Sequence, residues 1–557
     1  MGKTVESKRF DATGHPVEDT MNVGGQFWPA GRNGISRKRF LQLAAIAGSG
    51  LALGACGGDQ QETAKAAGPT GPPKRGGTLR IGLSTDVSEF EPHISTGAAS
   101  NLIRIMVYSP LLTYDKRGEL IGNLAEDFGW ADDRTYEVKL REAVQFHNGD
   151  ELTLEDVVYS FQRIKDPKTA ADLSERLADV EKVEAGDGNV VRFRLKQPNA
   201  VLPYLLADPS SAIVSKKWIE GGAKPKTEVM GTGPFKFVER MPGVSVKLER
   251  NDNYFVPKLP YLDGIDIQPL AEDNARVNAL RSGSVDFIDY VPYTAMDIIE
   301  RTSDLVLKSD KVLGFGWMGF VVDKKPVDDQ KVRQAFAYGM DREKMVQTAF
   351  SGHGVPISGG IIPEGWVGHS PDLEGTYEPD YDRAKKLLRE AGLPSPSVDI
   401  LSTSAYSVIA RPAEAAQAEL KNAGINGNLV MQEWLTFLDT VEAGTYPVHV
   451  WGSTPDFNDP DFLSDYIGSD GWFAQYIKFK DEKIDELLLE GRRTVGAREK
   501  RDEIYHDVQE RMLDLAPWTL LIRREQGEAM KSYVGGYTHI PAGAWSMITL
   551  RETWLDK

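Results

Sequence analysis

Two kinds of hydrophobic pattern alternate along the chain. Residues 77–83, 135–140 and 190–195 place apolar side chains at every second position, which is typical of half-buried antiparallel strands. Other stretches repeat apolar residues at spacings of three and four, as helices with one buried face do. The mixture of both patterns, from residue 76 to the C-terminus, predicts the α/β class, with sheets covered by helices.

Several of the predicted helices have recognisable ends. Thr153 precedes the helical stretch 154–161, and Asp156 follows three residues later, which is close to a capping box. Residues 484–515 contain two helical patterns that are separated near Gly496. These signals predict where the helices begin and end.

The longest apolar stretch, residues 40–55, follows the basic cluster Arg37-Lys38-Arg39. It is shorter than the roughly 20 residues of a bilayer span and suits the apolar part of an export signal. Leu53-Gly54-Ala55-Cys56 resembles a lipobox, in which the cysteine receives the lipid. We therefore expect residues 1–55 to be an export signal with a lipobox and Cys56 to be lipidated. The alternative is a buried N-terminal helix with an incidental free cysteine.

The segment that follows is polar. Residues 56–75 are rich in Gly, Pro, Gln and Ala, which favours a flexible tether between a lipid anchor and a folded body. Residues 36–42 resemble the twin-arginine export motif with Lys38 in place of the second arginine, so the export route stays open.

Length, charge and cysteine content limit the number of lobes, the partners and the kinds of site that are possible. A chain of 557 residues exceeds a single hydrophobic core, which stops growing at about 250–300 residues, so two large lobes are expected. The formal net charge is −17, with 82 acidic against 65 basic residues, which argues against a nucleic-acid partner. A single cysteine excludes an internal disulfide and any site that needs several cysteine ligands.

A series of motifs resembles the bacterial extracellular solute-binding proteins of family 5, the dipeptide-, oligopeptide- and nickel-binding components of ABC importers. The order of the motifs along the chain makes the resemblance specific, although each one alone is weak. The motifs are Asn123–Phe128, Asp133–Arg141, Val144–Asp150, Leu154–Ser160, Gly231–Lys236, Tyr261–Asp266, Asn278–Gly283 and Val332–Arg342.

The resemblance implies a two-lobe type II periplasmic-binding-protein fold with an inserted subdomain in the first lobe. The chain would pass between the lobes near residues 311–320 and again near 515–521, where Pro517 restricts the backbone. The implied boundaries are 76–117 for lobe 1, 118–229 for the inserted subdomain, 230–314 for lobe 1 continued, 315–518 for lobe 2 and 519–557 for the return to lobe 1.

The stretch 432–463 resembles the ligand-facing part of the second lobe in peptide-binding members. In those members the aspartate that matches Asp456 pairs with the α-amino group of the ligand, a strong contact where little water remains. Tryptophans that match Trp434 and Trp451 are expected to form flat apolar walls. The ligand-binding candidates are Asp456, Trp451, Trp434, Phe457, Glu89 and Trp317.

Structural roles are the alternative for each candidate. Asp456 and Asp459 stand in a loop rich in Pro, Asn and Asp, where aspartate often caps its own turn, and we expect that role for Asp459. Trp434, Trp451 and Trp317 are large aromatic residues, which are mostly buried in any case.

One departure from the family pattern bears on the ligand. Oligopeptide-binding relatives place arginines between the two tryptophan positions, but the interval from Trp434 to Trp451 contains none. A bidentate clamp for a ligand carboxylate is therefore missing from this segment. This weakens a short-peptide assignment and favours an amine-bearing compound, an opine-like conjugate or a sugar.

The expected function is binding and not catalysis. No Gly-x-Ser-x-Gly elbow or His-Glu-x-x-His motif is present, and no two histidines stand at a metal-ligand spacing, so neither a cofactor nor a metal is expected. His147 is expected to be structural. An exported hydrolase is the alternative of another class, and a receptor for signalling or chaperoning without an importer is a third.

The resemblance therefore implies a lipid-anchored receptor of an ABC importer. It would capture a small polar ligand, such as a peptide or an amine-bearing compound, and deliver it to a membrane permease with its ATPase. We expect a monomer without a nucleic-acid partner, exported to the periplasm or the outer face of the cytoplasmic membrane and held there by its lipid anchor.

Overall fold

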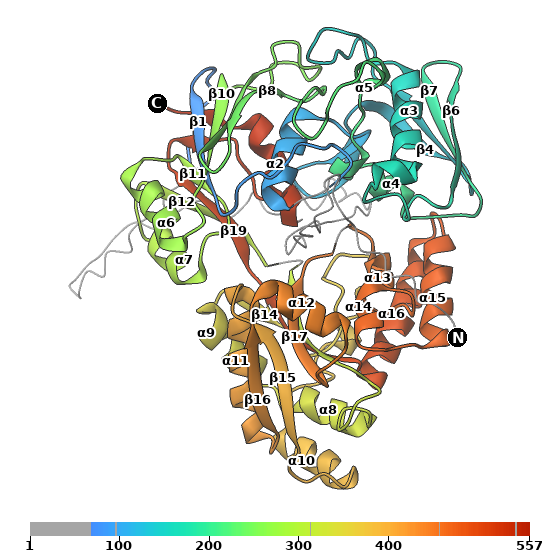
Figure 1. Ribbon diagram of the computed structural model, residues 1–557, viewed down its shortest axis with the longest axis vertical. Helices are drawn as coiled ribbons and strands as arrows, with labels where there is room; N and C mark the ends of the chain where they lie inside the picture. Colours follow the sequence, from blue (N-terminus) through green and yellow to red (C-terminus); the bar gives the residue numbers. More distant parts are fainter. Residues whose placement is uncertain (1–67, 95–96, 312–313, 456, 541–542) are drawn as a thin grey trace, which may run out of the picture.

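The computed structural model describes residues 68–94, 97–311, 314–455, 457–540 and 543–557. Two lobes, each built around its own mixed sheet, lie one above the other in Figure 1. A smaller antiparallel sheet, drawn in teal, extends the upper lobe on one side. The α/β class and the two-lobe arrangement predicted from the sequence are confirmed.

The upper lobe is organised by a seven-stranded sheet in the order β12-β19-β11-β1-β10-β9-β8. Strand β1 runs parallel to its neighbours β10 and β11, and its Leu79, Ile81 and Leu83 are buried, as the alternating pattern predicts. The strands are β1 (Thr78–Leu83), β8 (Phe235–Met241), β9 (Ser245–Arg250), β10 (Gly264–Pro269), β11 (Phe287–Ile288), β12 (Leu305–Asp310) and β19 (Gln526–Lys531).

Helices and two small ribbons complete this lobe. Helices α6 (Asp273–Ser282) and α7 (Tyr293–Glu300) pack against the sheet through a second cluster of buried apolar side chains. The other elements are α2 (Ala98–Val107), the ribbon β2 (Leu112–Tyr114) with β3 (Leu120–Gly122), the 3₁₀ segment η5 (Gly543–Glu552), and the ribbon β20 (Val534–Gly535) with β21 (Trp554–Leu555).

The inserted part of the upper lobe is a four-stranded antiparallel sheet with one long helix. Its order is β4-β5-β7-β6, and α3 (Leu154–Lys165) begins with the predicted capping box between Thr153 and Asp156. His147 Nε2 lies 3.1 Å from the carbonyl oxygen of Gly233, so it ties this part to the start of β8, in agreement with a structural role. The remaining elements are β4 (Ala125–Asp132), β5 (Thr135–Leu140), β6 (Val180–Gly186), β7 (Val190–Leu195), α4 (Leu202–Leu205) and α5 (Lys216–Glu220).

The lower lobe contains a six-stranded sheet in the order β14-β18-β13-β17-β15-β16. Its strands are β13 (Phe315–Phe320), β14 (Gly354–Pro356), β15 (Ser397–Thr403), β16 (Asn426–Gln432), β17 (Val448–Ser453) and β18 (Trp518–Arg524). Its helices are α8 (Gln330–Tyr338), α9 (Arg342–Phe350), α10 (Tyr381–Glu390), α11 (Ser407–Asn422), α12 (Trp434–Glu442), α13 (Leu463–Ile467), α14 (Trp472–Tyr476), α15 (Glu482–Arg493) and α16 (Arg498–Leu515). The last two are the helices predicted on either side of Gly496.

The chain passes between the two sheets twice. The first passage joins β12 to β13 across residues 311–314, within the predicted stretch. The second joins β18 to β19 at Glu525, so the predicted boundary at residue 518 is too early. Pro517 ends the preceding helix, but residues 518–531 form two strands in near succession. Nothing in their hydrophobic pattern marks the change of sheet.

The inserted subdomain also touches the lower lobe at a distance from these passages. The backbone N–H of Ala200 donates to the carbonyl oxygen of Arg492 at 2.8 Å. Arg176 forms an ion pair with Asp465 of α13 at 3.0 Å. A cavity of about 360 Å³ lies between β4 and α4 of the subdomain and the start of α16. We call these contacts the clasp.

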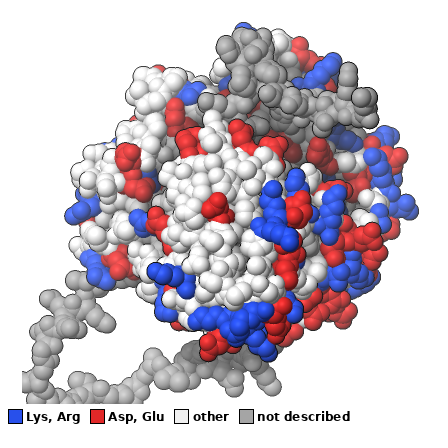
Figure 2. Space-filling model, turned by 60° about the horizontal axis from the view of Figure 1, so that its bottom comes forward, with Lys and Arg blue, Asp and Glu red and all other residues white. Residues whose placement is uncertain are grey.

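Charged side chains are mixed over the face shown in Figure 2, which brings the lower end of the molecule forward. Basic and acidic residues alternate along one side and the lower rim, around a broad uncharged area. On the parts of this face that are not grey, acidic and basic side chains are intermixed and do not form one large patch of a single sign. None of the helices within the described ranges is both long and apolar enough to cross a membrane.

Candidate ligand-binding site

The carboxyl ends of four strands of the lower sheet meet at the edge that faces the upper lobe. Strand β13 begins there, directly after the first passage, and β17 and β18 run antiparallel to it. Strands β15 and β16 run parallel to β17. The chain moves outward from β15 to β16 and then returns to place β17 on the other side of β15. Open α/β sheets bind ligands in the crevice at such a switch point.

Trp434 and Trp451 form one aromatic group at this edge. Trp434 begins α12 directly after β16, and its ring centroid lies 5.6 Å from that of Trp451 on β17. Tyr406, in the loop after β15, packs edge-on against Trp434 at 4.8 Å and is 36% exposed. Trp434 Nε1 is buried and has no hydrogen-bond partner within the described ranges. Tyr406 was missed from the sequence, where the strand that precedes it, Ser397–Thr403, was not predicted either.

Trp317 lies behind this group. It faces Trp451 across the antiparallel pair β13–β17, and it is completely buried. Its ring packs against Phe473 at 5.1 Å and Trp518 at 5.4 Å. In this conformation Trp317 supports the aromatic group from the core of the lobe and presents no surface of its own.

Phe457 lies under a residue of the other lobe. It is 5% exposed, and the guanidinium carbon of Arg176 lies 4.9 Å from its ring centroid. The same arginine forms the ion pair of the clasp with Asp465. The loop after β17 is therefore covered by the inserted subdomain, which the sequence could not indicate because Arg176 is 281 residues away in the chain.

The far end of this loop is fixed by buried charges. Asp459 caps a short 3₁₀ turn by accepting a hydrogen bond from the N–H of Asp461, as predicted. Both oxygens of its carboxylate also accept hydrogen bonds from Arg501 of α16, at 2.7 and 2.5 Å. Burial raises the pKa of Asp461 to about 6, although Arg492 binds it at 2.8 Å. The loop is thus anchored to α15 and α16 from behind.

Asn458 stands in this anchored loop and is completely buried. Among the described residues, neither its amide nitrogen nor its amide oxygen has a hydrogen-bond partner. A buried polar group without a partner costs roughly 1–3 kcal/mol. The amide is therefore a group for which a new partner would be favourable.

Glu89 lies in the upper lobe in a loop that contacts the inserted subdomain. Its carboxylate is half-buried and pairs with Lys226 at 3.3 Å. Its neighbour Glu91 is more deeply buried, and Arg163 of α3 donates to both of its oxygens at 2.8 and 3.0 Å. In this loop Glu91 is the structural anchor, and Glu89 remains more accessible.

The second passage is tied to both lobes through Glu525. Ser309 Oγ donates to one carboxylate oxygen at 2.5 Å, and His353 Nδ1 lies 3.1 Å from the other. The second ring nitrogen of His353 lies 3.1 Å from Asp297 of α7. Burial opposes the ionisation of Glu525, yet the hydrogen bonds from Ser309 and His353 keep its pKa below the ordinary value.

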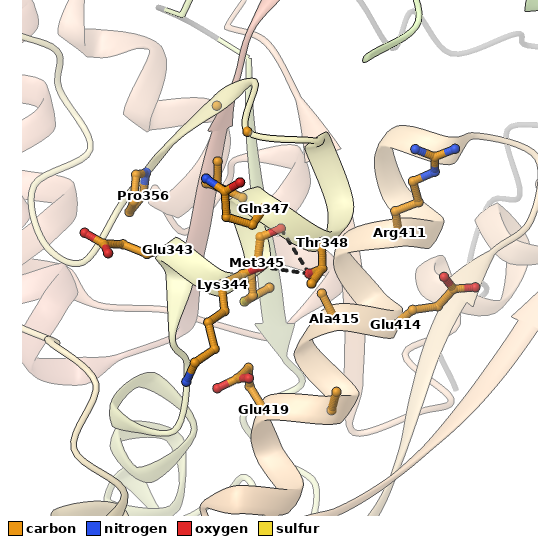
Figure 3. Close-up of a pocket in the computed structure, with 14 residues that line it drawn as sticks. Glu343, Lys344, Met345, Gln347, Thr348, Pro356, Arg411, Glu414, Ala415 and Glu419 are labelled. Carbon is orange, nitrogen blue, oxygen red and sulfur yellow. Dashed lines mark hydrogen bonds between the residues drawn. The ribbon is translucent and has the colours of Figure 1, made fainter. Parts of the chain in front are cut away.

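Another hollow, of about 830 Å³, lies in the lower lobe between α9 and α11 (Figure 3). Lys344 and Glu419 project toward it, and both are engaged, Lys344 with Asp341 and Glu419 with the hydroxyl of Tyr381. None of the ligand-binding candidates in the described ranges lines this hollow. It is therefore distinct from the edge where Trp434 lies.

Two predicted residues cannot be placed in this way. Asp456 and Cys56 lie outside the described residues. Within the described ranges, no group of three or more His, Cys, Asp or Glu side chains is arranged to hold a metal ion.

Comparison with known proteins identifies relatives over most of the chain. It is 28% identical to the oligopeptide-binding protein AppA of Bacillus subtilis (strain 168) over 549 residues, which cover 93% of this chain and 98% of AppA. It is 26% identical to the glutathione-binding protein GsiB of Escherichia coli (strain K12) over 481 residues, which cover 84% of this chain and 93% of GsiB.

A solved structure shares both sequence and fold. The periplasmic binding protein AgaA of A. tumefacien R10, in complex with agropinic acid, has a TM-score of 0.76 and 32% identity over 86% of this chain and 99% of AgaA. The periplasmic-binding-protein fold is thereby confirmed. The family model for bacterial extracellular solute-binding proteins, family 5 (middle part) matches residues 119–475, more than half of the chain. The chain therefore belongs to the family 5 bacterial extracellular solute-binding proteins.

Proposed function

We propose that this protein is the solute receptor of an ABC importer, which closes two lobes over a small polar ligand and delivers it to a permease. The convergence of the β15–β18 strand ends on the edge facing the upper lobe carries the proposal. Both passages lie at the same edge, so rotation about them would open and close the site. A ligand that contacts both lobes stabilises the closed state by shifting its population.

The ligand is proposed to be a peptide or an opine-like acid, with a sugar as the alternative. The named relatives bind oligopeptides and glutathione, and AgaA holds agropinic acid. The interval from Trp434 to Trp451 lacks the arginines of oligopeptide-binding members, which weakens a short-peptide assignment. The likeness to AgaA, at 32% identity, supports the opine-like acid. Within the site we propose that Asp456 pairs with an amine and that Trp434 provides an apolar wall. Trp451 and Trp317 would hold Trp434 in place.

Phe457 and Glu89 complete the proposed site from opposite sides. Phe457 would contribute to the ligand-facing loop after β17 while the guanidinium of Arg176 lies over its ring. Glu89 would act from the upper lobe, where its only described ion pair is with Lys226.

The binding proposal is tested by thermal unfolding with glutathione, peptides, agropinic acid, sugars and nickel, and by mass spectrometry of the ligand that co-purifies. We expect a rise in the midpoint with a small acid or peptide. Asp456→Asn should then weaken affinity for that ligand at least tenfold, whereas Asp470→Asn, at an exposed position, should leave it unchanged. Failure of every solute to shift the midpoint would contradict receptor function. A ligand recovered with altered mass would favour the hydrolase instead.

The lipid anchor is proposed from Cys56 and tested separately. Wild-type protein expressed in a bacterium should incorporate labelled palmitate and sediment with membranes, and Cys56→Ser should do neither. Equal membrane association of the variant would contradict the anchor without affecting the binding proposal. Growth on the identified ligand after deletion of a neighbouring permease gene tests the importer partnership. Sedimentation of the purified protein tests the expected monomer.

A further inference from the structure

Arg524, the last residue of β18, is a buried cation without a carboxylate partner among the described residues. It is 7% exposed. One terminal nitrogen donates to Thr454 Oγ1 at 2.9 Å, while its Nε is buried and has no hydrogen-bond partner in the described part of the chain. The adjacent Glu525 is engaged by Ser309, His353 and, at 3.6 Å, Lys311. Burial of a guanidinium without a counter-charge is costly, so the position is favourable for an anion.

The guanidinium lies between the lobes. Thr454 follows β17 directly, at the strand ends that form the candidate site. Tyr290 and Tyr293 of the upper lobe face this region. Burial raises the pKa of each to about 12, and the positive charge of Arg524 acts to lower both values. Both tyrosines are therefore within electrostatic reach of Arg524.

The side chain lies against Gly314 at the end of the first passage. A Cβ added at Gly314 would overlap Arg524 Nε, and the backbone N–H of Arg524 donates to the carbonyl oxygen of Gly314 at 2.8 Å. Gly314 therefore leaves the space that the guanidinium occupies. Both passages and the end of β17 thus place this one cation at the joint.

We infer that Arg524, aided by Thr454, receives a carboxylate of the ligand. This inference rests on the proposed function and names the acidic part of its substrate. A guanidinium offers paired N–H donors that match the two oxygens of a carboxylate. Arg524 supplies the cation that is missing between Trp434 and Trp451, from a different strand. Because it stands where the lobes join, the same contact favours the closed state.

The test uses paired probes, agropinic acid with its methyl ester and glutathione with its diethyl ester, measured by calorimetry on the full protein. Wild type should bind at least one acid tenfold or more tightly than its ester. Arg524→Gln should remove that preference by weakening the acid and sparing the ester. Arg524→Lys, which keeps the charge but not the paired donors, should retain part of the preference. Gly314→Ala should weaken the acid through displacement of the side chain.

Thermal unfolding without ligand provides the second readout. Removal of an unpaired buried charge should leave the midpoint of Arg524→Gln unchanged or higher. A clear fall in that midpoint, or a variant that does not fold, would show a structural partner and overturn the inference. Equal binding of acid and ester by wild type, or an acid preference that survives in Arg524→Gln, would also overturn it. Failure of wild type to bind either acid would overturn this inference alone, because the proposed function is decided by the wider set of solutes.

Discussion

Each buried carboxylate at the far end of the loop after β17 pairs with an arginine of α15 or α16. Asp459 and Arg501 are 0% and 8% exposed at the side chain and form a two-pronged ion pair. The sequence indicated the turn role of Asp459, because that role depends on its own neighbours. It did not indicate the ion pair, because Arg501 is 42 residues further along and reaches Asp459 only through the packing of α16.

Removal of one member of the Asp459–Arg501 ion pair should therefore destabilise the folded protein strongly. Asp459→Ala should lower the free energy of unfolding by about 3–5 kcal/mol, because it leaves the Arg501 charge buried and unpaired. Urea unfolding followed by circular dichroism measures this loss. The exposed Asp470→Ala should change stability by less than about 0.5 kcal/mol. A loss of that smaller size for Asp459→Ala would show that water or another group replaces the carboxylate.

His449 predicts a dependence of stability on pH. Burial lowers its pKa to about 4, from an ordinary value of 6.5. Between these values the unfolded chain binds one more proton than the folded protein, so His449 makes stability fall as the pH falls. The stability difference between wild type and His449→Gln should change by up to about 1.4 kcal/mol per pH unit in this window.

His506 provides a control of opposite sign. Its hydrogen bond with Asp372 raises its pKa above the ordinary value. The stability that His506 contributes is therefore fully present below pH 6.5 and is lost as the pH rises through its raised pKa. Parallel pH profiles for wild type and His449→Gln would contradict the assignment of a neutral, buried His449.

At the scale of elements, local signals predicted most of the structure. The capping box of α3 and the break between α15 and α16 follow from side chains close in sequence. The boundary at 518 failed, because the transfer from β18 to β19 depends on which distant strands each one pairs with. For the same reason the clustering of Trp434 with Tyr406 required the sheet order, which brings β15 and β16 together.

The α3 cap offers a test at this scale. Thr153→Ala should cost about 1 kcal/mol, because the N–H of Asp156 loses the hydroxyl that accepts from it. Thr153→Ser keeps the oxygen and should cost less. Chemical unfolding measures both variants. Equal stability of Thr153→Ala and wild type would mean that solvent caps the helix as well as the side chain does.

For the whole molecule, the two lobes touch at the passages and again at the clasp. Arg176 contributes to the clasp twice, through its ion pair with Asp465 and its position over the ring of Phe457. The clasp adds contacts between the lobes beyond the two chain passages, so it opposes their relative rotation. It should favour the closed arrangement even without ligand.

Arg176→Ala should therefore open the ligand-free protein. We expect a larger radius of gyration in small-angle X-ray scattering and a weaker affinity for the identified ligand, because closure then has less support. Arg134→Ala is the matched control, since Arg134 is exposed and its described ion pair is with the adjacent Asp133, at 3.6 Å. An unchanged radius for Arg176→Ala would contradict a role of the clasp in closure.

The position of β18 and β19 has a consequence for how the two lobes depend on each other. Strand β18 lies between β14 and β13, and β19 lies between β12 and β11, so each fills an interior place in its sheet. The two strands are consecutive in the chain, joined at Glu525. A single short stretch, residues 518–531, therefore completes both sheets, and its loss would disable both lobes at once.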